Sequence, residues 1–85
     1  MISRMEAKNI AGGILKNAFN IDDLIKVKDK LCSEESMIDD ILTVFFGVWD
    51  DHKSNDGNTY ASIILQVAVN MKDATTEILF KKDKL

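Results

Sequence analysis

The chain has 85 residues, of which 46% are hydrophobic and 29% charged, a composition typical of one small globular domain rather than of a disordered segment. Its net charge is −3, and no basic stripe exists beyond a short lysine tail, so we expect no direct nucleic-acid binding. No apolar run reaches the roughly 18 residues of a membrane span, and no segment resembles a signal peptide. We therefore expect a cytoplasmic protein that does not bind membranes.

The first predicted helix covers residues 4–19. Ser3 and Glu6 have the spacing of a capping box, and small and branched apolar residues then recur along one helical face. Gly12 and Gly13 fall in the middle, where each costs about 1 kcal/mol relative to alanine. They indicate either a weak, bent helix or a point where the backbone contacts another chain.

A second, shorter helix is predicted over residues 21–32. Asn20 is its expected N-cap, and Asp22 and Asp23 lie in the first turn, where the helix dipole favours acids. Cys32, the only cysteine, would lie on the apolar side of this helix, so no internal disulfide is possible. We interpret it as a small buried hydrophobe, with an intermolecular bridge or a reactive thiol as the alternatives.

The third predicted helix, residues 35–52, is the element around which the others would pack. Drawn as a helix, it has an apolar arc about 200° wide, roughly twice that of an ordinary surface helix. Such a helix must contact at least two neighbours or leave a surface for a partner. Its remaining arc, about 120° wide, is polar and contains Ser36, Asp39, Asp40, Thr43, Gly47, Asp50 and Asp51.

The last element has two readings. Apolar residues from Tyr60 to Ile78 follow heptad spacing, which predicts a helix over residues 58–81. Residues 61–71 also alternate as a strand would, so a β-hairpin over about 41–71, and with it an α+β fold, is the alternative. We favour the helix because the heptad runs beyond the length of an ordinary strand. The prediction is therefore a single all-α domain, residues 1–85, folded as a small antiparallel four-helix bundle.

The sequence offers little for catalysis. His52 is the only histidine, no nucleophile or phosphate-loop motif occurs, and no cysteine and histidine set has zinc spacing. The polar loop around Asp56-Gly57 fails the calcium-loop template, because His52 and Ile63 would occupy the first and twelfth positions. We therefore expect no enzyme, no metal and no cofactor.

Acidity is concentrated in the middle of the chain, where residues 33–60 contain seven acidic groups and one lysine. Asp50 and Asp51 would lie at a helix C-terminus, where the dipole disfavours them. A rule broken without visible compensation indicates a possible function, although a charged run can also be a solvated face. We predict a site for a partner protein with a basic surface, formed by Asp39, Asp40, Thr43, Asp50 and Asp51, with Trp49 and Tyr60 as aromatic anchors.

These features together predict a small acidic protein-binding module, of the inhibitor, immunity-protein or adaptor type, whose acidic central helix engages its partner. In size and charge the chain is similar to small bacterial immunity proteins and phage-encoded inhibitors, although no motif of such a family aligns with it. The alternative is a structural homodimer or assembly subunit. Its interface would be a second apolar face on the last predicted helix, made of Leu65, Val69 and Phe80.

Overall fold

In the computed structural model, which describes residues 1–49 and 60–85, the chain begins with helix α1 (Arg4–Ala18), as its sequence predicts. The Glu6 backbone N–H donates to the Ser3 hydroxyl at 3.1 Å, so the predicted cap is confirmed. Gly12 and Gly13 lie on the side of α1 that faces away from the sheet. No described atom of another element lies within 4 Å of where a Cβ would stand at either glycine.

Helix α2 (Ile21–Val27) also begins as predicted, because the Asn20 side chain accepts the Asp22 backbone N–H at 2.8 Å. It ends earlier than expected. One 3₁₀ turn, η1 (Lys28–Lys30), follows, and the chain becomes extended at Leu31. Cys32 therefore lies on a strand rather than on a helix.

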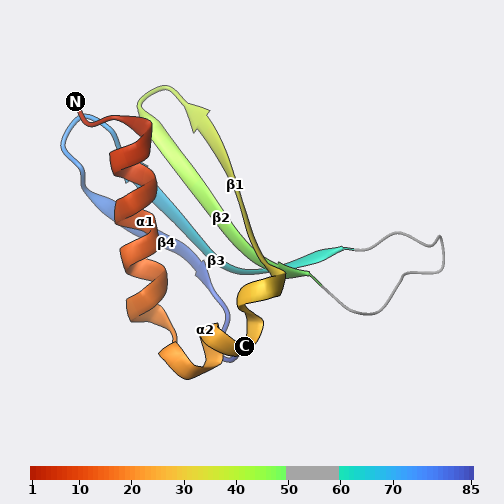
Figure 1. Cartoon of the computed structure of the whole chain (residues 1–85). Coiled ribbons are helices and arrows are strands. Elements are labelled where there is room, and N and C mark those ends of the chain that lie inside the picture. The colour runs from red at the N-terminus through yellow and green to blue at the C-terminus, as the bar shows by residue number, and fades with distance from the viewer. Residues whose placement is uncertain (50–59) are drawn as a thin grey trace.

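The rest of the described chain is a four-stranded antiparallel sheet in the order β1 (Leu31–Ile38), β2 (Ile41–Trp49), β3 (Ala61–Asn70) and β4 (Thr76–Lys81) (Figure 1). The helices predicted over 35–52 and 58–81 are therefore wrong, and so is the all-α four-helix bundle. The fold is α+β. The hairpin kept as the alternative over about 41–71 corresponds to β2 and β3, which pair along their length.

Strands replace the expected helices because β2 and β3 contain no charged residue and are rich in branched and aromatic residues, which suit a pleated, buried sheet. The three-residue step of the heptad spacing from Ile64 to Val67 arises from a β-bulge. Phe46 pairs with Leu65 and Gly47 with Ile63, so Ile64 is an extra residue, and both Ile64 and Leu65 are buried. After the bulge, alternation continues and buries Val67. The bulge shifts the apolar pattern by one residue, which gives a spacing of three within a strand.

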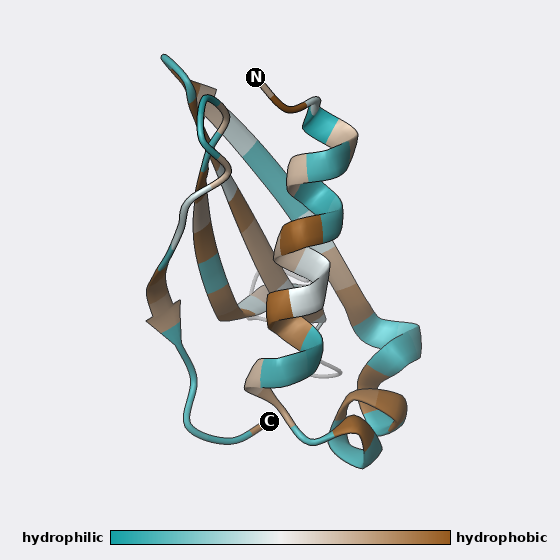
Figure 2. Ribbon diagram, turned by 90° about the vertical axis from the view of Figure 1, so that its left-hand side faces the viewer, coloured by the Kyte–Doolittle hydropathy of each residue, from teal (hydrophilic) through white to brown (hydrophobic). Residues whose placement is uncertain are grey.

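One face of the sheet packs against α1, which contacts β2 and β3 (Figure 2). The core forms between these two layers, and Phe19 and Leu24 close it at the α2 end. No helix or strand of the described chain covers the opposite face. The core consists of Ala7, Ala11, Leu15, Phe19, Leu24, Leu42, Val44, Phe46, Ile64, Leu65, Val67, Val69 and Met71.

The second apolar face predicted from Leu65, Val69 and Phe80 does not form. Leu65 and Val69 are fully buried inside the chain, on the α1 side of β3. Phe80 is 45% exposed and pairs with Gln66. Gln66 follows Leu65 in β3 and therefore points to the side of the sheet away from α1. Phe80 therefore lies on the opposite face of the sheet from Leu65 and Val69, because strand alternation and not helical periodicity governs the direction of these side chains.

Candidate binding groove on the uncovered sheet face

The uncovered face takes every second residue of the central strands. Along β2, Leu42, Val44 and Phe46 point to the core, and the residues between them point away from it. The same register brings Phe45 next to Glu34 of β1 and Gln66 of β3. The exposed face is therefore a mixture of large apolar and polar side chains.

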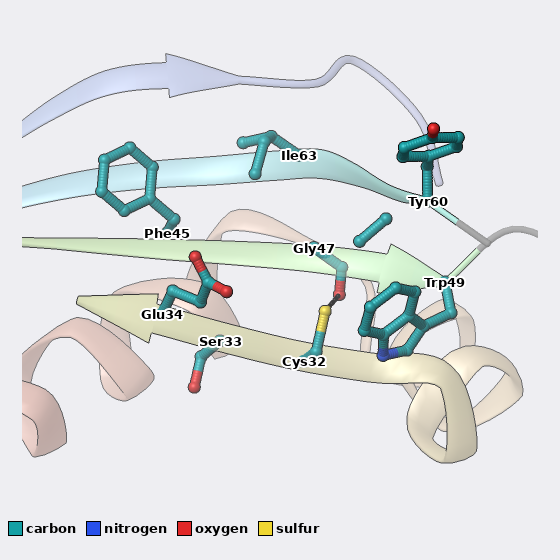
Figure 3. Close-up of a pocket in the computed structure, with 9 residues that line it drawn as sticks. Cys32, Ser33, Glu34, Phe45, Gly47, Trp49, Tyr60 and Ile63 are labelled. Atoms are coloured by element: carbon teal, nitrogen blue, oxygen red, sulfur yellow. Dashed lines mark hydrogen bonds between the residues drawn. The ribbon is translucent and has the colours of Figure 1, made fainter. Parts of the chain in front are cut away.

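A groove of about 490 Å³ lies on this face at the end of the sheet where β2 stops and β3 begins. Cys32, Gly47 and Ala61, which are small, form its floor in three neighbouring strands. Larger side chains stand around this floor, and Figure 3 shows Trp49 and Tyr60 at one end and Phe45 at the other. The groove is lined by Cys32, Ser33, Glu34, Phe45, Gly47, Trp49, Tyr60, Ala61 and Ile63.

The groove exists because Gly47 has no side chain. A Cβ at this position would lie 3.2 Å from the Ser62 carbonyl oxygen and 3.5 Å from the Cys32 sulfur, so it would occupy the floor. The Cys32 thiol donates to the Gly47 carbonyl oxygen at 3.5 Å, a contact drawn in Figure 3. This contact directs the sulfur toward the floor, and the volume above it stays open between the larger walls.

The electrostatics of the sheet differ between its two sides. The four strands contain one basic residue, Lys81, whose ammonium group lies 5.3 Å from the centre of the Phe19 ring and therefore on the α1 side. Glu35 is also on that side, paired with Arg4 at 3.7 Å and with Lys8 at 3.8 Å. Glu34 lines the groove, and Glu77 pairs with Ala68. The strand residues of the uncovered face therefore include two acidic side chains, Glu34 and Glu77, and no basic one.

The structure brings together two of the predicted site residues. Trp49 and Tyr60, expected as aromatic anchors, are 45% and 56% exposed and both line the groove. Thr43, two residues before Phe45, lies on the same face of β2. The role of these side chains in binding stays a prediction.

The predicted acidic arc requires a helix, and residues 36–49 instead form strands joined by a turn. Asp39 and Asp40 make that turn, with Asp39 at a φ of 54°, at the opposite end of β2 from Trp49. Asp40 pairs with Lys72 at 3.2 Å, so it connects two turns of the sheet. Asp50, Asp51 and His52 lie outside the described residues.

Seven of the nine residues that line the groove are not among the predicted site residues, and Phe45, Ile63 and Glu34 are the three with large side chains. Drawn on a helix, Phe45 belonged to the wide apolar arc and Glu34 to a helix N-terminus, where an acid needs no further explanation. The signal that identifies Phe45 is the alternation along β2, in which Thr43, Phe45, Gly47 and Trp49 share one face. Glu34 and Ile63 join this face only through the pairing of β1 and β3 with β2.

The described part of the chain contains no cluster of side chains suited to holding a metal, and no helix there is long and apolar enough to cross a membrane. Comparison with known proteins finds no family model, no curated protein and no solved structure that matches this chain. The function must therefore be argued from the groove itself.

Proposed function

We propose that this protein is a small binding module that receives a segment of a partner protein in the groove on its uncovered sheet face. The observation that carries the proposal is the exposure of Trp49, Tyr60 and Ile63, at 45%, 56% and 42%, around one groove. Aromatic residues of this kind dominate the energy of protein interfaces when they surround a pocket. In this proposal the binding surface is a sheet face, in place of the acidic helix predicted from the sequence.

The shape of the groove favours a protruding apolar side chain of the partner. Its volume of about 490 Å³ lies over a floor of Gly47, Ala61 and Cys32, with aromatic rings at both ends. A branched or aromatic side chain entering from above would contact these rings and displace water from the floor, which is the main favourable term in such contacts.

The charge of the face selects the residues beside that side chain. No basic residue of the strands accompanies Glu34 and Glu77 on the uncovered side, and neither forms an ion pair within the described chain. A partner segment with lysine or arginine next to its apolar residue would therefore be attracted, and an acidic segment repelled. The proposed ligand is an apolar and cationic peptide segment, and the module has no enzymatic role in this proposal.

Selection from a random displayed-peptide library on the immobilised protein tests the proposal. We expect enriched peptides that combine an aromatic or branched aliphatic residue with lysine or arginine. Trp49→Ala should weaken their binding by about tenfold or more, the effect of removing an interface anchor. Ile25→Ser is the matched control, because Ile25 is 54% exposed on α2, away from the groove, and its loss should leave affinity unchanged.

The electrostatic part of the proposal has its own test with the same peptides. Glu34→Gln should weaken binding, and the remaining affinity should depend less on salt between about 50 and 500 mM. Asp83→Asn, which removes the same charge from the C-terminal tail, is the control. Enriched peptides that are acidic, or whose affinity is the same for Trp49→Ala and wild type, would overturn the proposal.

A further inference from the structure

Strand β4 has an unusual place in this sheet. It is an edge strand, and all six of its residues are exposed. Ile78, Leu79 and Phe80 are exposed by 49%, 48% and 45%, and β4 contributes no member of the core. An apolar edge of this kind offers unpaired backbone groups together with surface that favours burial.

The apolar residues of β4 point to both sides of the sheet. Ile78 pairs with Val67 of the α1 side, and Phe80 pairs with Gln66 of the uncovered side, because Leu79 is an extra residue in a bulge. A continuous apolar run is typical of a strand that is buried on both faces. The sequence of β4 is therefore that of an interior strand, although within one chain it lies at the edge.

The opposite edge, β1, has the reverse character. The middle of β1 is Ser33-Glu34-Glu35-Ser36. Within it, Glu35 forms ion pairs with Arg4 and Lys8 of α1. Charges and attached side chains of this kind protect an edge from pairing. The two edges thus differ in character: β1 presents charged and polar side chains to a partner strand, and β4 presents an apolar run.

We propose that β4 pairs antiparallel with β4 of a second copy of the chain, about a two-fold axis normal to the sheet. The result is a dimer with one continuous sheet of eight strands, four from each copy. Pairing over the whole strand places Thr76 opposite Lys81, Glu77 opposite Phe80, and Ile78 opposite Leu79 of the other copy.

The bulge at Leu79 makes this register possible. Opposite residues in an antiparallel pair must share a face, and in a regular six-residue strand the end-to-end register would set residues of opposite faces against each other. Here Glu77 and Phe80 pair with Ala68 and Gln66, both on the uncovered side. Thr76 and Lys81 pair with Val69 and Leu65, both on the α1 side. The extra residue therefore lets all six residues of the strand pair with the same strand of the other copy.

The charges of β4 do not oppose the same partner. Glu77 is on the uncovered side of the sheet, and Lys81 is on the α1 side, over the Phe19 ring. Antiparallel pairing sets Glu77 opposite Phe80 and Lys81 opposite Thr76 of the other copy, so no like charges face each other across the interface. Pairing of β4 with β1 would instead set the apolar run against Glu34 and Glu35. The contact is therefore a closed two-fold dimer and not an open filament.

Sedimentation at micromolar concentration tests the proposal. Wild type should have twice the mass of one chain, and Leu79→Lys should halve it, since a charge is placed at the centre of the interface on a side chain that is already half exposed. Ser36→Lys puts the same side chain on the opposite edge and should leave the dimer intact. A wild type that is monomeric, or a dimer that Leu79→Lys leaves intact, overturns the proposal.

Crosslinking decides the matter if Leu79→Lys does not fold. In a Cys32→Ser background, Leu79→Cys lies beside the two-fold axis and should be converted by a mild thiol oxidant into a disulfide-linked dimer. Ser36→Cys in the same background should stay unlinked under the same conditions. Equal linkage in both variants, or none at Leu79→Cys, overturns the proposal. Trp49→Ala should not change the mass, so failure of the groove and failure of the dimer are distinguishable.

Discussion

The two faces of the sheet use the same strands for different purposes. On the α1 side, Leu42, Val67 and Val69 are fully buried, and this side carries the stability of the domain. On the other side, Trp49 and Ile63 of the same strands are about half exposed around the groove. Since neighbouring residues alternate between the faces, the strands can hold a core and a candidate binding surface within one short stretch of sequence. The same substitution should thus cost much more stability on the α1 side of a strand than on its uncovered side.

The largest expected effect contrasts Val69→Glu with Ile63→Glu. Val69 is fully buried, so Val69→Glu places an unpaired charge in the core and should cost about 4 kcal/mol or more, enough to unfold a domain of this size. Ile63 is 42% exposed, and Ile63→Glu should cost at most about 1 kcal/mol, mainly through lower strand propensity. Urea denaturation followed by circular dichroism measures both.

The same pair of variants also separates stability from function. Ile63→Glu should weaken binding of the selected peptides, because it changes the groove wall and leaves the fold intact. Equal loss of stability in the two variants would show that the uncovered face is covered in solution, and the comparison of the faces would fail.

The sequence predicts the starts of the two N-terminal helices correctly because the signals there are local, whereas α2 ends at Val27 and not at the predicted residue 32. The Ser3 and Asn20 caps act within one turn, and each is present where expected. The sheet depends on partners far along the chain. Leu31–Ile38 has the polar composition of a helix start and becomes a strand because it pairs with β2. No local pattern reveals such a pairing.

The candidate site was predictable in part for the same reason. Trp49 and Tyr60 flank one connection in either reading of the chain, so their proximity survived the wrong fold. The predicted acidic arc does not form, because it requires the rotation of 100° per residue of a helix, and residues 36–49 form strands joined by a turn. In the strand, Thr43 and Trp49 share a face for a different reason, a period of two.

The second prediction applies the comparison to α1. Its inner side consists of Ala7, Ala11 and Leu15, and its outer side includes Gly12 and Gly13, which no other element approaches within 4 Å. Gly12→Ala and Gly13→Ala together should raise the free energy of unfolding by up to about 2 kcal/mol, from higher helix propensity. Thermal denaturation measures the gain, and sedimentation is the control, because the variant should have the same mass as wild type.

If the double change lowers stability instead, the outer side of α1 is in contact with another surface. The backbone-contact hypothesis for Gly12 and Gly13 would then regain support. Ala11→Gly is the matched change on the inner side and should destabilise the protein by roughly 1 kcal/mol or more.

The third prediction concerns the turn before β4. Because β4 buries nothing of its own in one chain, its pairing with β3 depends on this turn. Ala74 has a φ of 62°, a conformation that costs an L-residue about 1–2 kcal/mol. Ala74→Gly should therefore increase the free energy of unfolding by about 0.5–1 kcal/mol, after the entropic cost of glycine. Hydrogen exchange in β4 should slow, whereas a faster exchange would contradict the role of the turn.

The smallest effect concerns Asp73, in the same turn. The Thr75 backbone N–H and hydroxyl donate to its carboxylate at 3.0 and 2.7 Å, and these hydrogen bonds lower the pKa of Asp73. A carboxyl group whose pKa is lower in the folded state stabilises the protein above its unfolded pKa, and this contribution is lost as pH falls through the folded pKa. Asp73→Asn should thus lower Tm slightly at neutral pH, and the difference from wild type should disappear in the acid range. Asp83→Asn, in the tail, should show no such convergence. Because β4 depends on this turn, a difference that persisted undiminished at low pH would mean that the Asp73 charge is not what secures the edge strand, and that the turn acts through its backbone alone.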